Sequence, residues 1–556
     1  MDILKKNQNI DQKFRYKFFF SLFICILILG GSLNIFITPP FENFDEAAHF
    51  SAIKQIAYEN KIVKKKDSFV DKNIQNYKQI GPGPYGSGIP PFDKGEYGIV
   101  YYKFFNSLEK KEDFIKTLNS PPLKSYEKGE DKNHQYTQHP FLFYLILSLP
   151  FKFLENFNLL DQILILRFIC YLISLIGIGL GIKAILNLCK NKNDLLLKKS
   201  NIILGLTFYP LIFPGFFIEF ARIGNDSLCV MLIGLFLYIY SNLENKTKIS
   251  NDLFYLGIIL ALGLLTKAFF IPFSFASFFF LIFIFFKKNF SVKKIFINII
   301  IFLSPIIVVI FYYYIDSFLS ANNLIGVNII NQMSEKNVRI FDVFLIDNFL
   351  KIFIRGILTI PVTFIWSGTA SLVHINYFLY LIPILIILFI IYMVFVNLKE
   401  FRNSHFFYFS IFVLSIFFIG LIIHSLLHFV TWKDNANSPG WYLHMLFPFI
   451  VPFVGYGIKF INYKILITIL VLSFLSLFWI YWSQFSLFSG CAIKNFDKSY
   501  KFNSDYFCFD NFSILLENLN LISFPMLFIY CFVFFLIAYF VIIKILIESL
   551  NNLKED

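Results

Sequence analysis

Long apolar stretches recur along almost the whole chain, and they limit its fold more than any other feature of the sequence. The first covers residues 18–37 and the last covers residues 520–547. A helix needs about 20 apolar residues to cross a bilayer, where every backbone polar group must be paired within the protein. The residues AVILMFWYC make up 57% of the chain and charged residues 15%, against about 45–50% and about 25% in soluble proteins. The sequence therefore predicts an all-α polytopic membrane protein and excludes soluble globular, disordered and disulfide-rich classes.

Basic residues predict how these segments are oriented in the membrane. The N-terminal residues 1–17 are basic, and dense Lys and Arg clusters flank alternate short loops, which places these loops and both termini in the cytoplasm. The net charge of +13 is explained by contact of these loops with anionic membrane lipids, and no nucleic-acid-binding pattern accompanies it. We expect about twelve spans in the plasma (inner) membrane. They cover residues 18–37, 162–188, 201–221, 227–241, 253–266, 268–286, 295–315, 372–397, 406–430, 441–458, 465–482 and 520–547.

The polar residues after the first span form the largest segment expected outside the membrane. The first span lacks a small-residue cleavage site and is expected to remain as an uncleaved signal anchor. Within the segment that it delivers to the outer face, residues 139–154 are apolar but short, which suits a half-helix or an interfacial helix. The expected organisation is a cytoplasmic N-terminus (1–17), a first transmembrane helix (18–37), an extracytoplasmic loop with juxtamembrane helices (38–161), a transmembrane bundle (162–482), a second extracytoplasmic loop (483–519), and a last transmembrane helix with a cytoplasmic tail (520–556).

The seven cysteines are scattered along the chain. Five of them lie in or beside apolar runs, where they act as small apolar residues. Cys491 and Cys508 share the second outer loop, and the sequence leaves open whether they form a disulfide or remain two free thiols.

The most informative polar run lies directly after the first span. Pro39 and Pro40 end that helix, and Asp45, Glu46 and His49 follow them closely. A second helix is expected here because apolar residues again repeat at helical spacing, and Asp45 and His49 then share one face. Asp45 either caps this helix or belongs to a functional site at the membrane surface.

This run resembles the acidic motif of the GT-C superfamily of glycosyltransferases. It is most similar to a largely uncharacterised family of bacterial polytopic membrane proteins with a PP…DExxHF signature. Residues 138–144 (QHPFLFY) resemble the family's HPPLYY run, with Phe141 in place of the second proline, and Arg167 fits the arginine that opens the next span. Residues 221–226 (ARIGND) resemble its NND segment, with Gly224 in place of the first asparagine.

Two further segments extend the resemblance towards the C-terminus. Residues 264–267 (LLTK) resemble the family's membrane-embedded lysine motif. Residues 439–443 (PGWYL), followed by Pro448, look like its GRYLxP stretch, although Trp441 stands where arginine is usual. The resemblance covers residues 18–460 in order and spacing, and it implies a GT-C-like fold with a large first outer loop.

GT-C enzymes transfer a sugar from a polyprenyl-phosphate donor at the outer membrane face, and the resemblance implies the same activity here, with a cell-envelope glycan, lipid or protein as acceptor. Asp45 would be the general base of an inverting transfer. Glu46 would position the acceptor or a metal, and His49 would orient Asp45 or contact a sugar hydroxyl. No cofactor is established, and a divalent metal and its ligands stay open. The implied substrate-binding residues are His139, Arg222, Asn225, Asp226, Lys267, Arg355, Trp441, Tyr442 and His444.

Other interpretations of these residues stay open. Lys267 would bind the lipid phosphate, but it equally fits a lysine that snorkels between two short helices. Asn225 and Asp226 also suit a helix N-cap. A transporter or flippase for a lipid-linked or sugar substrate is the alternative function, with Asp45 and Lys267 as gating or coupling charges. Because carriers place such charges nearer the bilayer midplane, the acidic pair in a large outer loop favours the enzyme.

Overall fold

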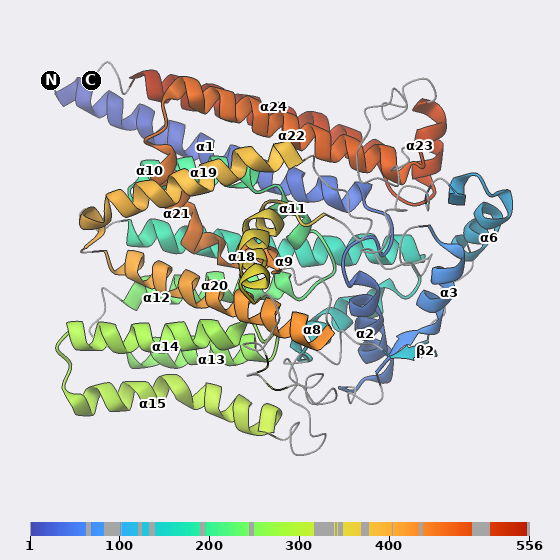
Figure 1. Ribbon diagram of the computed structural model, residues 1–556, viewed down its shortest axis with the longest axis horizontal. Coiled ribbons are helices and arrows are strands. Elements are labelled where there is room, and N and C mark those ends of the chain that lie inside the picture. The colour runs from blue at the N-terminus through green and yellow to red at the C-terminus, as the bar shows by residue number, and fades with distance from the viewer. Residues whose placement is uncertain are drawn as a thin grey trace.

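Long helices run side by side as one bundle, and shorter helices and a small sheet gather at one end of it (Figure 1). α1 (Asp2–Ile37) begins and α24 (Pro525–Asn552) ends at the opposite end. The two ends of the chain therefore lie on one side of the bundle, as predicted, and the cytoplasmic orientation of that side stays a prediction. The computed structural model describes residues 2–62, 68–82, 101, 103–119, 125–132, 139–189, 194, 196–243, 249–315, 339, 342, 349–368, 377–402, 404–432, 438–491 and 512–552.

Nine helical segments in the described part of the chain are long and apolar enough to cross a membrane, which confirms an all-α polytopic protein. The expected number of about twelve spans stays a prediction, because three further apolar helices are shorter. The long segments are α1, α9 (Leu159–Leu188), α12 (Asp226–Leu243), α14 (Phe270–Lys287), α15 (Val292–Val309) with η3 (Ile310–Ile315), α20 (His405–Trp432), η6 (Gly440–Leu446) with α21 (Phe447–Ile458), α22 (Tyr463–Phe488) and α24; the short ones include α8 (Leu142–Phe151) with η2 (Lys152–Leu154), α13 (Ser250–Leu264) and α19 (Tyr377–Val396).

The third expected span, residues 201–221, is not one continuous helix. α10 (Lys199–Ile212) ends before Phe213, and α11 (Gly215–Phe220) begins after Pro214. Phe213 has φ −121° and ψ 71°, because a residue that precedes proline is disfavoured in the helical region. The break leaves room for a polar turn, residues 221–225, before α12 begins.

Close backbone contact joins α9 and α12, two long helices that pack along each other. A Cβ atom added to Gly177 would lie 2.4 Å from the Cα of Met231, and one added to Gly234 would lie 2.0 Å from the carbonyl oxygen of Gly177. Small residues at such crossings allow helices to approach closely in a membrane. This pair fixes the position of the first residues of α12 relative to Arg167 on α9.

The elements of the first polar segment lie at the end of the bundle away from the two ends of the chain (Figure 1). Cys491 follows the end of α22 and is disulfide-bonded, and Cys508 lies outside the described residues. Residues 349–365 form α18 (Phe349–Ile365), which packs on η6. The remaining elements are α2 (Glu46–Glu59), the antiparallel strands β1 (Phe69–Asp71) and β2 (Lys128–Lys132), α3 (Lys72–Ile80), α6 (Leu108–Asn119), η5 (Leu398–Phe401) and α23 (Phe512–Asn520).

Candidate functional site

The chain turns back on itself between α1 and α2, and Arg167 from α9 holds this turn. The Arg167 guanidinium donates to the carbonyl oxygen of Thr38 at 2.5 Å and to that of Pro39 at 2.8 Å. Both carbonyls lie just beyond the end of α1, where Pro39 and Pro40 stop the helix, and the Pro39 carbonyl also accepts from the Glu42 backbone N–H at 3.3 Å. Arg167 supplies a side-chain donor to each of them, although it lies 129 and 128 residues further along the chain.

Arg167 also forms a two-point ion pair with Glu46, the first residue of α2. Arg167 Nε lies 2.7 Å from Glu46 Oε1, and Nη2 lies 2.5 Å from Oε2. The side chains are 2% and 0% exposed. Asn43 Nδ2 and the Ile223 backbone N–H also donate to Oε1, at 3.2 and 3.3 Å. The Glu46 carboxylate is thus enclosed and saturated with donors, which suits a positioning residue.

Asp45 directly precedes Glu46, but its exposure and its backbone conformation differ from those of Glu46. Its side chain is exposed, and its backbone is left-handed, with φ 60° and ψ 4°. Asp45 is the N-cap residue of α2, but its side chain makes no capping hydrogen bond to that helix. Left-handed backbone is uncommon outside glycine, and Asp is among the residues that tolerate it best. The ion pair beside Asp45 therefore holds an exposed carboxylate in an unusual conformation.

A second buried cluster of charges forms around Asp226, at the start of α12. Arg222 Nη2 lies 2.9 Å from Asp226 Oδ2 and 2.7 Å from Glu219 Oε1, and Lys267 Nζ donates to Asp226 Oδ1. The four side chains are at most 9% exposed. Lys267 follows α13 and Arg222 follows α11, so cations from two separate turns of the chain meet at Asp226.

The environment of Arg222 and Lys267 keeps both of them charged. Burial opposes the charge on Arg222, but Glu219, Asp226 and Asp45 hold its pKa above the usual value. Burial likewise opposes the charge on Lys267, but Asp226 raises its pKa above the usual value. The contribution from Asp45 shows that its exposed carboxylate lies within electrostatic range of Arg222.

The acidic turn and the Asp226 cluster form one site. Arg222 Nη1 lies 3.4 Å from the carbonyl oxygen of Phe44, the residue before Asp45. Glu46 accepts from Ile223, the residue after Arg222. The C-terminal end of α1 and the N-terminal ends of α2 and α12 therefore meet at this point. They belong to the end of the bundle that carries the first polar segment (Figure 1).

Aromatic side chains from η6 cover this site. Trp441 stacks on Phe44, with ring centroids 6.4 Å apart and planes 10° from parallel. Lys267 Nζ lies 4.1 Å from the centroid of the Tyr442 ring, a favourable cation–π distance. Both η6 residues are partly exposed. The sequence prediction that Trp441 and Tyr442 belong with Lys267 and the acidic run thus agrees with their placement.

Two histidines stack beside the acidic turn. The rings of His49 and His139 lie 6.0 Å apart at an interplanar angle of 20°, and Tyr144 Oη lies 3.0 Å from His49 Nδ1. Burial, followed by repulsion from His139 and Arg222, holds the pKa of His49 well below its usual value. Burial and then Lys267 lower the pKa of His139 to about 3. Both imidazoles are therefore neutral at pH 7, and His49 contacts Tyr144 through its side chain.

Some polar atoms at the site have no hydrogen-bond partner among the described residues. Both side-chain atoms of Asn225 are buried and unpaired, as are Arg222 Nε and His139 Nδ1. Asn225 is 1% exposed. A buried amide without a partner is costly, at about 1–3 kcal/mol, and natural proteins retain few of them. These atoms can therefore form further hydrogen bonds within the site.

Two of the predicted site residues lie elsewhere. His444 is 0% exposed and contacts Tyr209 Oη at 3.1 Å and the ring of Phe364 at 4.6 Å, so it belongs to an aromatic core. Arg355 is exposed on α18 and does not belong to the buried cluster. A role of either residue in substrate binding stays a prediction.

The structure also brings in residues that the site prediction omitted. Arg167 and Glu219 are buried ion-pair partners, and Tyr144 contacts His49. The sequence signal for Arg167 and Glu219 is a charged residue inside an apolar run, since such residues in membrane segments are seldom without a partner; Tyr144 carries no such signal. Among the described residues, no group of three or more His, Cys, Asp or Glu side chains gathers in a way that could hold a metal ion.

Comparison of the chain with protein-family models, with curated proteins and with solved structures finds no match. The function of this site is therefore inferred from its own residues and geometry, together with the motif resemblance.

Proposed function

We propose that the protein is an integral-membrane glycosyltransferase. It moves a sugar from a polyprenyl-phosphate donor to a cell-envelope acceptor at the outer membrane face, with inversion at the anomeric carbon. The observation that carries this proposal is the pairing of an exposed carboxylate, Asp45, with the buried cations Arg222 and Lys267 at the end of the bundle. A base next to fixed positive charge is what displacement of a phosphate by a hydroxyl group requires.

Asp45 is the proposed general base. The acceptor oxygen attacks the anomeric carbon while Asp45 takes the hydroxyl proton, and the bond from that carbon to the phosphate oxygen breaks. Its electron pair leaves with polyprenyl phosphate. The sugar passes through an oxocarbenium-like state, as in glycoside hydrolysis. The left-handed backbone at Asp45 suits this role, because strained conformations are retained where the surrounding structure enforces them for function.

The phosphate of the donor would bind at the Asp226 cluster. Arg222 Nε and the Asn225 amide are donors without protein partners among the described residues, and Lys267 supplies a further charge close by. Asp226 neutralises part of this charge in the free protein, which lowers the cost of burying two cations without a ligand. An incoming phosphate would share these donors as charge develops on the leaving oxygen.

The sugar and the acceptor would lie between the histidines and the η6 aromatics. Neutral His139 offers an unpaired Nδ1 to a sugar hydroxyl, and Trp441 offers a ring face, as sugar-binding sites commonly do. Glu46 and Arg167 are assigned to positioning Asp45. This replaces the expectation that Glu46 contacts the acceptor or a metal, because its carboxylate is 0% exposed and already accepts from three residues.

The test uses the full-length protein in lipid nanodiscs with radiolabelled polyprenyl-phosphate glucose, mannose, galactose or arabinose. The proposal expects release of polyprenyl phosphate with at least one donor, accelerated by a crude cell-envelope acceptor fraction. Movement of an intact donor across the bilayer of proteoliposomes, with no cleavage, would instead establish the flippase. A chain that neither cleaves nor moves any of these donors would contradict both functions and favour a structural role.

A further inference from the structure

A cleft opens between α14 and α20 at the end of the bundle opposite the candidate site. Its volume is about 650 Å³, within the range of about 300–1,000 Å³ that is common for ligand pockets. α14 ends at Lys287 and α20 begins at His405, so the cleft lies where both helices reach the end of the bundle that carries the chain termini (Figure 1). The lining residues are Phe279, Phe280, Phe283, Lys287, Arg402, Tyr408, Ile411, Phe412 and Ser415.

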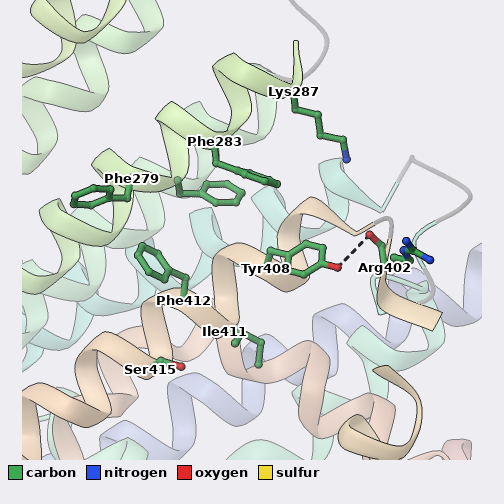
Figure 2. A pocket seen from close by; sticks show the side chains of 9 residues that line it. Phe279, Phe283, Lys287, Arg402, Tyr408, Ile411, Phe412 and Ser415 are labelled. Carbon is green, nitrogen blue, oxygen red and sulfur yellow. Dashed lines mark hydrogen bonds between the residues drawn. The ribbon is translucent and has the colours of Figure 1, made fainter. Parts of the chain in front are cut away.

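The cleft is amphipathic along its length. Figure 2 shows Lys287 and Arg402 at one end, with Phe279, Phe412 and Ser415 towards the other. Lys287 and Phe279 are eight residues apart on one helix, which corresponds to about 12 Å at 1.5 Å per residue. The charged end lies at the ends of the two helices, and the apolar end extends along them towards the middle of the bundle. This order matches that of headgroup and acyl chain in one leaflet of a membrane.

Aromatic packing joins the two helices beside the cleft. Phe280, which lines the cleft, stacks on Phe409 with ring centroids 4.3 Å apart and planes 6° from parallel. Tyr408 donates to the carbonyl oxygen of Arg402 at 3.3 Å and so fixes the turn that carries the guanidinium (Figure 2). The walls are mostly aromatic and aliphatic side chains, and Phe279, Phe283 and Ile411 among them are exposed at the surface of the bundle.

The two cations at the mouth have no acidic partner among the described residues. No carboxylate lies within ion-pairing distance of Lys287 Nζ or of the Arg402 guanidinium in that part of the chain. Positive charge thus accumulates above an apolar cleft, and an anionic group with an attached hydrocarbon chain complements both features.

We propose that this cleft binds one anionic phospholipid of the adjacent leaflet. Its phosphate would lie between Lys287 and Arg402, and one acyl chain would follow Phe283, Phe279 and Phe412 into the cleft. Basic residues near a membrane surface attract anionic lipids, with about 1 kcal/mol for each cation. The proposal is independent of the glycosyltransferase function, because the cleft and the candidate site use different helices at opposite ends of the bundle.

Native mass spectrometry of the full-length protein tests this proposal, with phosphatidylglycerol and phosphatidylcholine as the titrated lipids. The first phosphatidylglycerol should bind preferentially, and Lys287→Gln with Arg402→Gln should weaken it by about fivefold for each cation removed. Lys459→Gln with Lys464→Gln is the matched control, because both lysines are exposed at the same end of the bundle but do not line the cleft. This control should retain the preference.

A second variant separates the cleft from general surface charge. Ser415→Phe fills the apolar end and keeps both cations, and it should also weaken binding of the first phosphatidylglycerol. Unchanged lipid preference in the Lys287 and Arg402 double variant would overturn the proposal, as would an equal loss in the Lys459 and Lys464 control. Displacement of the bound lipid by millimolar inorganic phosphate would assign the cations to a free anion and would also overturn it.

Discussion

Arg167 and Glu46 form a buried two-point ion pair, with 2.7 Å between Nε and Oε1 and 2.5 Å between Nη2 and Oε2. They join α9 to the first residue of α2, and they hold the turn that presents Asp45. Because neither side chain reaches water, each charge depends on the other and on the surrounding hydrogen bonds.

Removal of one partner should therefore destabilise the protein strongly. Glu46→Gln is expected to cost about 3–5 kcal/mol, since it leaves Arg167 as an uncompensated buried charge. Thermal denaturation of the detergent-solubilised protein, followed by size-exclusion chromatography, measures the effect. Glu59→Gln is the control, because Glu59 pairs with Lys61 at 3.5 Å where that lysine is 67% exposed, and such pairs contribute about 1 kcal/mol or less. Equal effects would contradict the structural role of the buried pair.

The backbone at Asp45 predicts an unusual order of substitutions. With φ at 60°, glycine and asparagine fit this position, whereas valine should cost about 1–2 kcal/mol because its branched Cβ clashes in left-handed backbone. Thermal midpoints should therefore be similar for Asp45→Gly, Asp45→Asn and the natural chain, and lower for Asp45→Val. A valine variant as stable as the asparagine variant would show that the turn adopts another conformation in the membrane.

Close packing of α9 on α12 predicts opposite effects for two neighbouring glycines. Gly177→Ala should destabilise by about 1–3 kcal/mol, because the added Cβ would lie 2.4 Å from the Cα of Met231 and overpack the crossing. Gly179→Ala is the matched control, since nothing lies within 4 Å of its Cβ position, and alanine is the better helix former by up to about 1 kcal/mol. The same thermal assay distinguishes them. A destabilised Gly179→Ala variant would place the helix crossing on a different face.

Acid should destabilise the protein through the stacked histidines. In the folded protein the pKa of His139 is lowered from 6.5 to about 3, and the pKa of His49 is also lowered. At pH values between about 3 and 6.5 the unfolded chain binds more protons at His139 than the folded protein does. The stability that neutral His139 provides is therefore lost as the pH falls below about 6.5. We expect a loss of about 1 kcal/mol or more by pH 5.

Replacement of His139 by glutamine should reduce this acid sensitivity. The measurement compares thermal midpoints at pH 7.5 and pH 5.0 for the natural chain, His139→Gln and, as a control, His424→Gln at an exposed position of α20. The control should keep the full pH dependence. If His139→Gln keeps it as well, protonation of this ring is not the source of the acid effect.

Much of the fold could be predicted from the sequence, because apolar length and flanking charge are local properties. The first span, the short apolar helix after residue 139 and the helix that follows Asp45 all occur where the pattern indicates. The break at Phe213 and Pro214 is not predicted by the sequence pattern, because residues 201–221 are apolar enough throughout to indicate one span. A proline can be tolerated within a membrane helix, so its presence alone does not predict an end.

The candidate site was predictable only in part. Motif order placed Asp45, Asn225, Lys267 and Tyr442 together, and the structure agrees. The different roles of Asp45 and Glu46 were not predictable, because the burial of Glu46 depends on its ion pair with Arg167, 121 residues further along the chain. Burial of one carboxylate and exposure of its neighbour follow from this long-range contact and from the backbone turn, and neither is encoded in local spacing.

Proton transfer from the acceptor hydroxyl to the Asp45 carboxylate is the step on which the proposed function depends. It is tested most directly by the rate of sugar transfer in nanodiscs, with a donor that the natural chain cleaves, for Asp45→Asn and for the control Asp113→Asn on the exposed face of α6. We predict a loss of about 100- to 10,000-fold for Asp45→Asn, the usual contribution of a general base, with unchanged thermal stability and full activity in the control. Transfer by Asp45→Asn at the rate of the natural chain would contradict the account.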